Sequence, residues 1–146
     1  MKRAFTYLEL ISTIAIIAIV FSIAILKVGA IDEIKERAEF RAIVNDIKYA
    51  RNLAIVSKSN VEFQVVVTDF NGYKIFQAGE KTNKEVKKVE LEKLSRVNTT
   101  YYDEQLHFKN DGMPNKGGRI EYKGKKKYYT VTIGVASGKV YIRGER

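Results

Sequence analysis

Residues 5–26 read FTYLELISTIAIIAIVFSIAIL, and this stretch decides how the chain is organised. It is apolar around its whole circumference when wound as a helix, and it carries one charged residue, Glu9. At about 1.5 Å per residue such a helix spans roughly 33 Å, which is enough to cross a bilayer. The sequence therefore predicts one transmembrane helix close to the N-terminus.

The four residues before this stretch include Lys2 and Arg3. Basic residues beside a membrane span stay on the cytoplasmic side, so we expect the C-terminal part of the chain on the other side. A secretory signal peptide also has a basic start and an apolar run. Here the apolar run is too long for one, and no A-x-A-like cleavage site follows Leu26. We therefore predict a single-pass membrane protein.

The remaining composition limits the possible chemistry. At 146 residues, with 45% hydrophobic and 29% charged side chains, the chain has room for one modest domain and an accessory segment. It has no cysteine and one histidine, His107, so neither a thiolate site nor a His-based metal cluster can form. We find no phosphate-binding or nucleophile motif. We expect no enzyme activity and no cofactor, and we interpret His107 as a structural residue.

Beyond Lys27 the apolar residues follow one side of a helix. They recur at helical spacing, and charged residues fill most of the other positions; the apolar set is Ile31, Ile34, Ala38, Phe40, Ile43, Val44, Ile47, Ala50 and Ala54. This pattern predicts that the membrane helix continues as an amphipathic helix to about Ser57. Its apolar stripe requires a partner surface.

The residues after 58 have the pattern of β-strands. The runs VEFQVVVTDF (61–70) and YKIFQA (73–78) flank Asn71-Gly72, a strong hairpin signal. Further strand candidates lie at 85–94, 106–108, 119–123, 128–135 and 139–143. We therefore predict an α+β fold, in which a long N-terminal helix packs on an antiparallel β-sheet domain.

Glu9 is the residue of the apolar stretch that most clearly indicates a function, because a carboxylate in a membrane span is costly unless it finds a partner. Lys2-Arg3-Ala4 followed by FTYLEL resembles the class III signal of type IV prepilins and pseudopilins, with Ala4 where that family most often has Gly. The resemblance implies that a prepilin peptidase cuts between Ala4 and Phe5 and that the new amine of Phe5 is methylated. It also implies that Phe5 and Glu9 of adjacent subunits pair during filament assembly.

The resemblance continues through the chain. AEFRAIVNDIKYARNLAIVSKSNVEFQVV (38–66) and YTVTIGVASGKVYI (129–142) are similar to the GspH/FimT group of minor pseudopilins. This implies a pilin-like lollipop with a leader at 1–4, a transmembrane and filament-core helix at 5–29, an amphipathic continuation at 30–57 and a globular β-sheet domain at 58–146.

The same resemblance implies a minor pilin or pseudopilin subunit. Such a subunit joins other pilin subunits at an assembly platform of the inner or cytoplasmic membrane. The filament is then extracellular or periplasmic, and belongs to a type IV pilus, a competence system or a type II secretion system. A membrane-anchored interaction protein that forms no filament is the alternative.

The charge of the chain suggests a further partner. The formal net charge is +9, and residues 105–146 contain ten Lys or Arg against three acidic residues. Cations interleaved with tyrosines suit sequence-tolerant DNA binding, and some FimT-like minor pilins bind DNA. The candidate residues are Lys116, Arg119, Lys123, Lys125, Lys126, Lys127, Lys139, Arg143 and Arg146. The alternative interpretation of 123–127 is an ordinary solvated turn.

Overall fold

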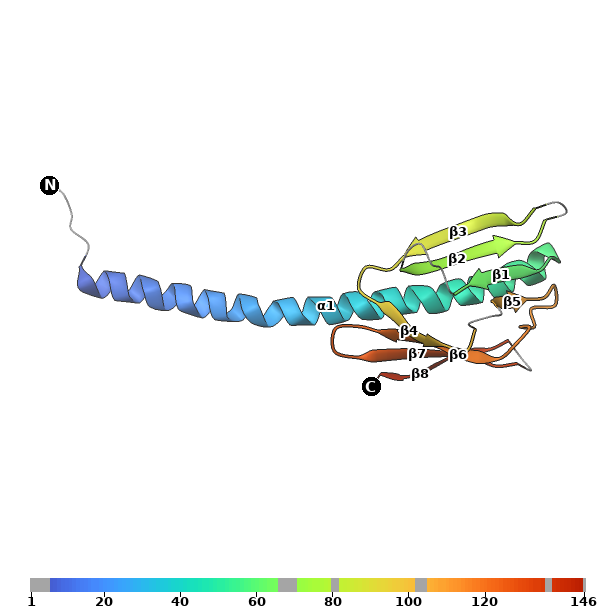
Figure 1. The fold of residues 1–146 in the computed structure, drawn as a ribbon. Helices are drawn as coiled ribbons and strands as arrows, with labels where there is room; N and C mark the ends of the chain where they lie inside the picture. The colour runs from blue at the N-terminus through green and yellow to red at the C-terminus, as the bar shows by residue number, and fades with distance from the viewer. Residues whose placement is uncertain (1–5, 66–70, 80–81, 102–104, 136–137, 146) are drawn as a thin grey trace. The chain divides into compact units, whose positions relative to one another are not determined.

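The computed structural model describes residues 6–65, 71–79, 82–101, 105–135 and 138–145; for residues 23–30, 144 and 145 the description covers the backbone only. Helix α1 (Tyr7–Ser57) is followed by eight strands (Figure 1). These are β1 (Val61–Gln64), β2 (Gly72–Gln77), β3 (Lys84–Glu90), β4 (Ser95–Thr99), β5 (Leu106–Phe108), β6 (Gly118–Lys123), β7 (Tyr128–Ile133) and β8 (Val140–Glu145).

The contacts divide the chain into two compact units, residues 1–34 and 35–146. In the first unit α1 begins with Thr6 as its N-cap, whose hydroxyl accepts a hydrogen bond from the Glu9 N–H at 3.3 Å. Among the helical residues that the structure describes, no stretch is long and apolar enough to cross a membrane. The transmembrane segment predicted for 5–29 stays a prediction.

The predicted amphipathic helix is confirmed from Phe40 onward, whereas Ile31, Ile34 and Ala38 of the predicted apolar stripe are exposed. Phe40, Ile43, Ile47, Ala50 and Ala54 are buried, with spacings of three and four residues that keep them on one side of α1. The helix ends at Ser57 as predicted, because Lys58 takes a left-handed conformation with φ of 52°.

Two antiparallel sheets cover this stripe, where the sequence predicted one. The first sheet has the strand order β3-β2-β1-β5 and the second has the order β4-β6-β7-β8. In Figure 1, β2 and β3 lie on one side of the second half of α1, and β6, β7 and β8 lie on the other. Residues that alternate along β1, β2, β6 and β7 are buried, and together with the stripe of α1 they form one core.

The prediction that Asn71-Gly72 forms the turn of a hairpin is wrong. A two-residue turn there would pair residue 70 with residue 73, but the observed register pairs Gln64 with Lys74, and Gly72 lies in β2 opposite Glu90. The Asn71 side chain instead donates to the main-chain oxygens of residues 91 and 94, at 3.1 and 2.7 Å. Strand β4 was also missed, because SRVNT has neither clear alternation nor a strong apolar content.

Three tyrosines of the core predict how stability responds to alkali. Burial raises the pKa of Tyr73, Tyr101 and Tyr122 above the ordinary value of 10.0, and at Tyr73 the hydrogen bond to Asp46 raises the pKa further. The folded chain therefore keeps these phenols neutral, while the unfolded chain loses their protons above about pH 10. The contribution of these neutral phenols to the free energy of unfolding is fully present below that pH. Above it the free energy of unfolding falls, by up to about 1.4 kcal/mol per pH unit for each tyrosine.

Urea unfolding at increasing pH measures this slope. The Tyr122→Phe variant removes one titrating group, so its free energy of unfolding is expected to fall less steeply above about pH 10 than that of the unmodified chain. Equal slopes for the two chains would contradict the assignment of Tyr122.

Candidate functional site

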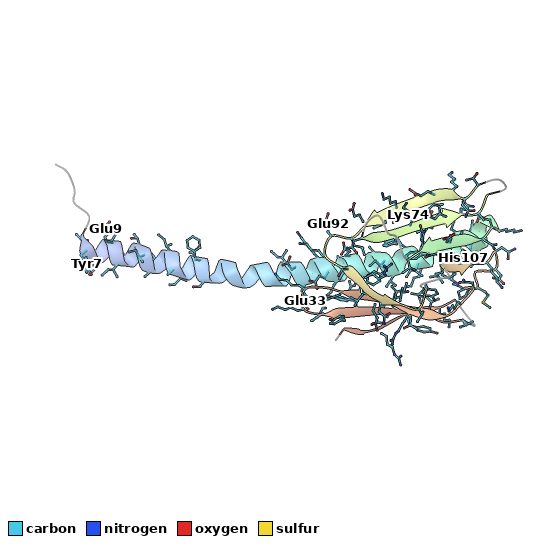
Figure 2. The ribbon with its side chains drawn as sticks, viewed as in Figure 1. Tyr7, Glu9, Glu33, Lys74, Glu92 and His107 are labelled. Carbon is cyan, nitrogen blue, oxygen red and sulfur yellow. The ribbon has the colours of Figure 1, made fainter. Side chains whose placement is uncertain are left out.

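The predicted processing residues Ala4 and Phe5 lie outside the described residues. Glu9 is described: it lies in the first turn of α1, and its residue is exposed (Figure 2). The first turn of a helix is the positive end of its dipole, where an acidic side chain is favourably placed. The structure thus leaves the Glu9 carboxylate accessible to a cation.

The residues after Glu9 form an apolar surface that the first unit does not cover. From Leu10 to Phe21 every large apolar side chain is at least half exposed; these are Leu10, Ile11, Ile14, Ile16, Ile17, Ile19, Val20 and Phe21. Fully burying a side chain of this size is worth about 1.5–3 kcal/mol. An exposed apolar surface that extends around a helix indicates a site of contact with lipid or with other proteins.

Three of the nine predicted basic residues lie on the outer face of the second sheet. Arg119 and Lys123 lie in β6 and Arg143 lies in β8, all at positions that alternate with the core-facing residues of these strands. The same outer face of the sheet carries Tyr128 and Tyr141, which are 44% and 53% exposed. The register places Arg119 and Tyr141 in one row across the sheet, on either side of Thr132.

Two contacts order this outer face. The Arg119 Nε lies 3.6 Å from a carboxylate oxygen of Glu121, and the Lys123 ammonium lies 5.9 Å from the centre of the Tyr128 ring. Both pairs are solvent-exposed, so they orient the side chains more than they stabilise the fold. The charge of Arg119 is partly balanced by Glu121.

The other predicted basic residues lie elsewhere. Lys125, Lys126 and Lys127 lie in the tip between β6 and β7, Lys116 precedes β6, and Lys139 directly precedes β8, where it lines a groove beside α1. Arg146 lies outside the described residues. The structure therefore does not bring the whole predicted set together on one face.

The tip between β6 and β7 is attached to α1, although Lys125 and Lys126 are exposed to solvent as in an ordinary turn. The carboxylate of Glu36, a residue 4% exposed, accepts hydrogen bonds from the Lys125 N–H at 2.8 Å and the Tyr129 hydroxyl at 3.2 Å. Gly124 lies so close that an added Cβ would collide with this carboxylate. The lysine side chains are therefore presented from a fixed main chain.

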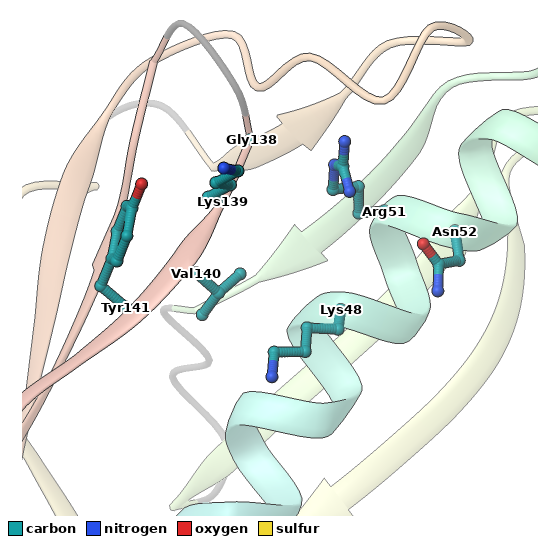
Figure 3. A pocket seen from close by; sticks show the side chains of 7 residues that line it. All are labelled: Lys48, Arg51, Asn52, Gly138, Lys139, Val140 and Tyr141. Carbon is teal, nitrogen blue, oxygen red and sulfur yellow. The ribbon is translucent and has the colours of Figure 1, made fainter.

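Sequence reasoning missed a second basic site, a groove of about 340 Å³ between α1 and the start of β8 (Figure 3). Lys48, Arg51 and Asn52 line it from α1, and residues 138–141 line it from the other side. The spacing of three and four residues within α1 placed these three side chains on one face of the helix. That spacing was visible in the sequence, but the strand opposite was not.

His107 has the structural setting that the sequence predicted for a strand residue. It lies in β5, and its Nδ1 is 4.0 Å from a carboxylate oxygen of Glu62 in β1. Among the described residues, no three His, Cys, Asp or Glu side chains come together in a way that would hold a metal ion. The basic outer face and the groove are thus the polar surface sites that stand out.

Comparison with known proteins gives the family. Residues 39–138 match the family model described as type II transport protein GspH. This chain belongs to the GspH family. It is a minor pilin or pseudopilin of the GspH/FimT group, as the sequence predicted, and this group consists of structural subunits.

Solved structures agree on the fold. The minor pilin FimU of the Pseudomonas aeruginosa type IV pilus matches with a TM-score of 0.60 and 15% identity, over 74% of this GspH-family chain and 87% of the FimU chain. The minor pseudopilin EpsH of the Vibrio cholerae type 2 secretion system matches with a TM-score of 0.58 and 12% identity, over 74% of this chain and 95% of EpsH. The comparison with curated protein sequences found no match.

The attachment of the β6–β7 tip to α1 can be tested by mutation. Gly124→Ala is expected to lower the free energy of unfolding by about 1–3 kcal/mol, because the new methyl group displaces the Glu36 carboxylate. Glu36→Ala is expected to cost a similar amount, about 1–3 kcal/mol, since the hydrogen bonds that this carboxylate accepts from the Tyr129 hydroxyl and the Lys125 N–H are lost. Urea unfolding measures both.

The double variant shows whether the two effects share one contact. The double variant is expected to lose less free energy of unfolding than the two single variants together. In it the methyl group added by Gly124→Ala has no Glu36 carboxylate to displace. Lys126→Ala, at an exposed position of the same tip, is the control and should change stability by less than about 0.5 kcal/mol. Strict additivity would contradict the contact.

Proposed function

We propose that this chain is incorporated, through the N-terminal part of α1, into a filament of the type IV pilus or type II secretion kind. The observation that carries the proposal is the exposed apolar surface from Leu10 to Phe21. Such a continuous apolar surface is unfavourable in water and is stable when other apolar groups cover it. Lipid supplies that cover for a subunit held in a membrane, and the helices of neighbouring subunits supply it within a filament.

In this proposal the chain is first held in the cytoplasmic or inner membrane by residues 5–29, with Lys2 and Arg3 on the cytoplasmic side. A prepilin peptidase then removes residues 1–4, and the amine of Phe5 is methylated. The domain at 58–146 lies outside the cytoplasm, where an assembly platform passes the subunit to the filament. The resemblance of the first ten residues to prepilin signals supports these steps.

Glu9 sets the position of the subunit in the filament. A carboxylate and an amine are each costly in an apolar environment, and pairing them offsets much of that cost. The Glu9 carboxylate is exposed in the first turn of α1, so the Phe5 amine of an adjacent subunit can reach it. One such pair per subunit fixes the axial register between neighbours.

The Glu9→Gln variant tests this role, since it keeps the side-chain size and removes the charge. Membrane insertion is expected to be unchanged, while incorporation into sheared filaments falls at least tenfold, because the amine of the neighbour is left without a counter-charge. Immunoblotting of the filament and membrane fractions measures both. Glu90→Gln, an exposed carboxylate of β3, is the matched control and should be incorporated normally.

The mass of the mature chain provides a control for processing. Loss of Met1 to Ala4 and one added methyl group on Phe5 are expected. A chain that keeps its first four residues would favour the alternative, a membrane-anchored interaction protein outside any filament. Normal incorporation of Glu9→Gln would contradict the pairing of charges.

A second candidate function is DNA binding by the outer face of the second sheet. There Arg119, Lys123 and Arg143 alternate with the exposed rings of Tyr128 and Tyr141. Cations that contact phosphates and aromatic rings that stack on bases are the features of sequence-tolerant single-strand binding. This arrangement would suit a subunit that captures DNA during uptake.

Titration of the full chain in detergent micelles with labelled single-stranded DNA tests this candidate. Binding is expected to weaken steeply with salt, and reversing both Arg119 and Arg143 to Glu should lower the slope of log K against log salt by about 1 or more. Tyr141→Ala is expected to weaken binding by about 1–3 kcal/mol through lost stacking.

The control reverses two other exposed lysines, Lys84 in β3 and Lys109 after β5, to Glu. This variant has the same net charge as the test variant, so it separates a localised site from a general charge effect. Equal losses in the two variants would contradict a DNA site on this face.

A further inference from the structure

The groove between α1 and β8 has one wall of side chains and one wall of main chain (Figure 3). Lys48, Arg51 and Asn52 project from α1, and the opposite wall is the segment 138–141, which leads into β8. The volume of about 340 Å³ lies near the lower limit for sites that bind ligands.

The helix wall is positively charged, and one of its cations is held in place. The Arg51 Nε donates to the main-chain oxygen of Gly112 at 3.2 Å, and Gly138 packs against the same guanidinium. Gly138 has a φ of 58°, and an added Cβ would also meet the Gly112 oxygen, so this contact needs glycine. In the part of the chain that the structure describes, the terminal nitrogens of Arg51 make no hydrogen bond.

The other wall is the edge of a sheet. Strand β8 is the last strand of the order β4-β6-β7-β8, and β7 is its partner among the described strands. The Lys139 oxygen accepts from the Gly134 N–H at 2.9 Å. Because hydrogen-bonded residues alternate along an antiparallel pair, the main-chain groups of Val140 and Ile142 are turned away from β7.

The side chains along this edge are partly apolar. Val140 points toward α1 and is half-buried, whereas Tyr141 points to the other side of the strand (Figure 3). Ile142 is 57% exposed although it lies opposite Val131 of the core. Exposed strand edges readily accept another strand, and natural proteins usually protect them.

We propose that this groove binds an acidic, extended peptide segment of a partner protein, which pairs with β8 as an added strand. The main chain of the segment would bond to Val140 and Ile142. Carboxylates on the side of the segment toward α1 would contact Lys48, Arg51 and Lys139, and the segment would cover Ile142. The proposal is independent of assembly through the N-terminal helix.

A peptide fits these features better than a nucleic acid does. Both would be attracted by the cations, but a peptide alone carries N–H and C=O groups at the spacing that a strand edge requires. Lys48 and Arg51 lie on the helix wall of the groove and Lys139 lies in the opposite wall, so the groove favours acidic side chains.

The test uses the full chain, labelled with ¹⁵N, in detergent micelles. The probe is an acetylated octapeptide that alternates Glu and Val. It is expected to shift the amide signals of residues 139–143 at concentrations up to about 1 mM, the range of a weak specific complex. Two control peptides have the same length: one alternates Lys and Val, and the other has Pro at two central positions, which removes main-chain donors.

The expected result is at least tenfold weaker binding for each control peptide. The double variant Lys48→Glu, Lys139→Glu should also bind the probe at least tenfold more weakly, while Lys84→Glu at the edge of the other sheet should bind it normally. Arg51 is left unchanged because it also holds Gly112.

Three outcomes would overturn the proposal. They are no shifts at residues 139–143, equal binding of the Pro-containing peptide, and displacement of the probe by single-stranded DNA at equal or lower concentration. The last result would assign the groove to nucleic acid. None of them depends on filament incorporation, so failure here is distinct from failure of the proposed assembly.

Discussion

The second half of α1 is the one element that both sheets bury, and the globular part of this chain depends on that shared surface. Phe40, Ile43, Ile47, Ala50 and Ala54 fill one side of the helix, and the inner faces of both sheets close over them. Burial of the three large side chains alone contributes roughly 5–9 kcal/mol before conformational entropy is counted. Among the residues that the structure describes, neither sheet has another helix against which to pack.

Carboxylates on the same helix attach the sheets to it. Glu36 continues the buried stripe toward the N-terminus and accepts from the β6–β7 tip. Glu39 accepts from three successive N–H groups of the turn at 92–94, at 2.7–3.0 Å. Asp46 accepts from the Tyr73 hydroxyl at 2.6 Å and the Lys87 ammonium at 2.7 Å. The bonds to the Tyr73 and Tyr129 hydroxyls are buried, where polar groups need a protein partner.

The charges of α1 are therefore used differently on its two flanks. On one flank the carboxylates of Glu39 and Asp46 accept hydrogen bonds from other parts of the fold. On the other flank Lys48 and Arg51 line an open groove. Residues 105–146, which include β6 and β8, carry ten Lys or Arg against three acidic residues. This division explains why the sites suited to acidic partners gather around β6 and β8.

The sequence by itself determined the apolar N-terminal helix, its amphipathic continuation to Ser57 and most of the strands, because these follow from periodicity along the chain. It also determined the family, through local motifs. Only the tertiary structure decided that the strands form two sheets, that Asn71 bridges to residues 91 and 94, and that Glu36 holds the basic tip. It alone placed Lys48 and Arg51 opposite β8. Each of these depends on contacts between residues far apart in the sequence, and strand register and side-chain partners are set by packing rather than by any local pattern.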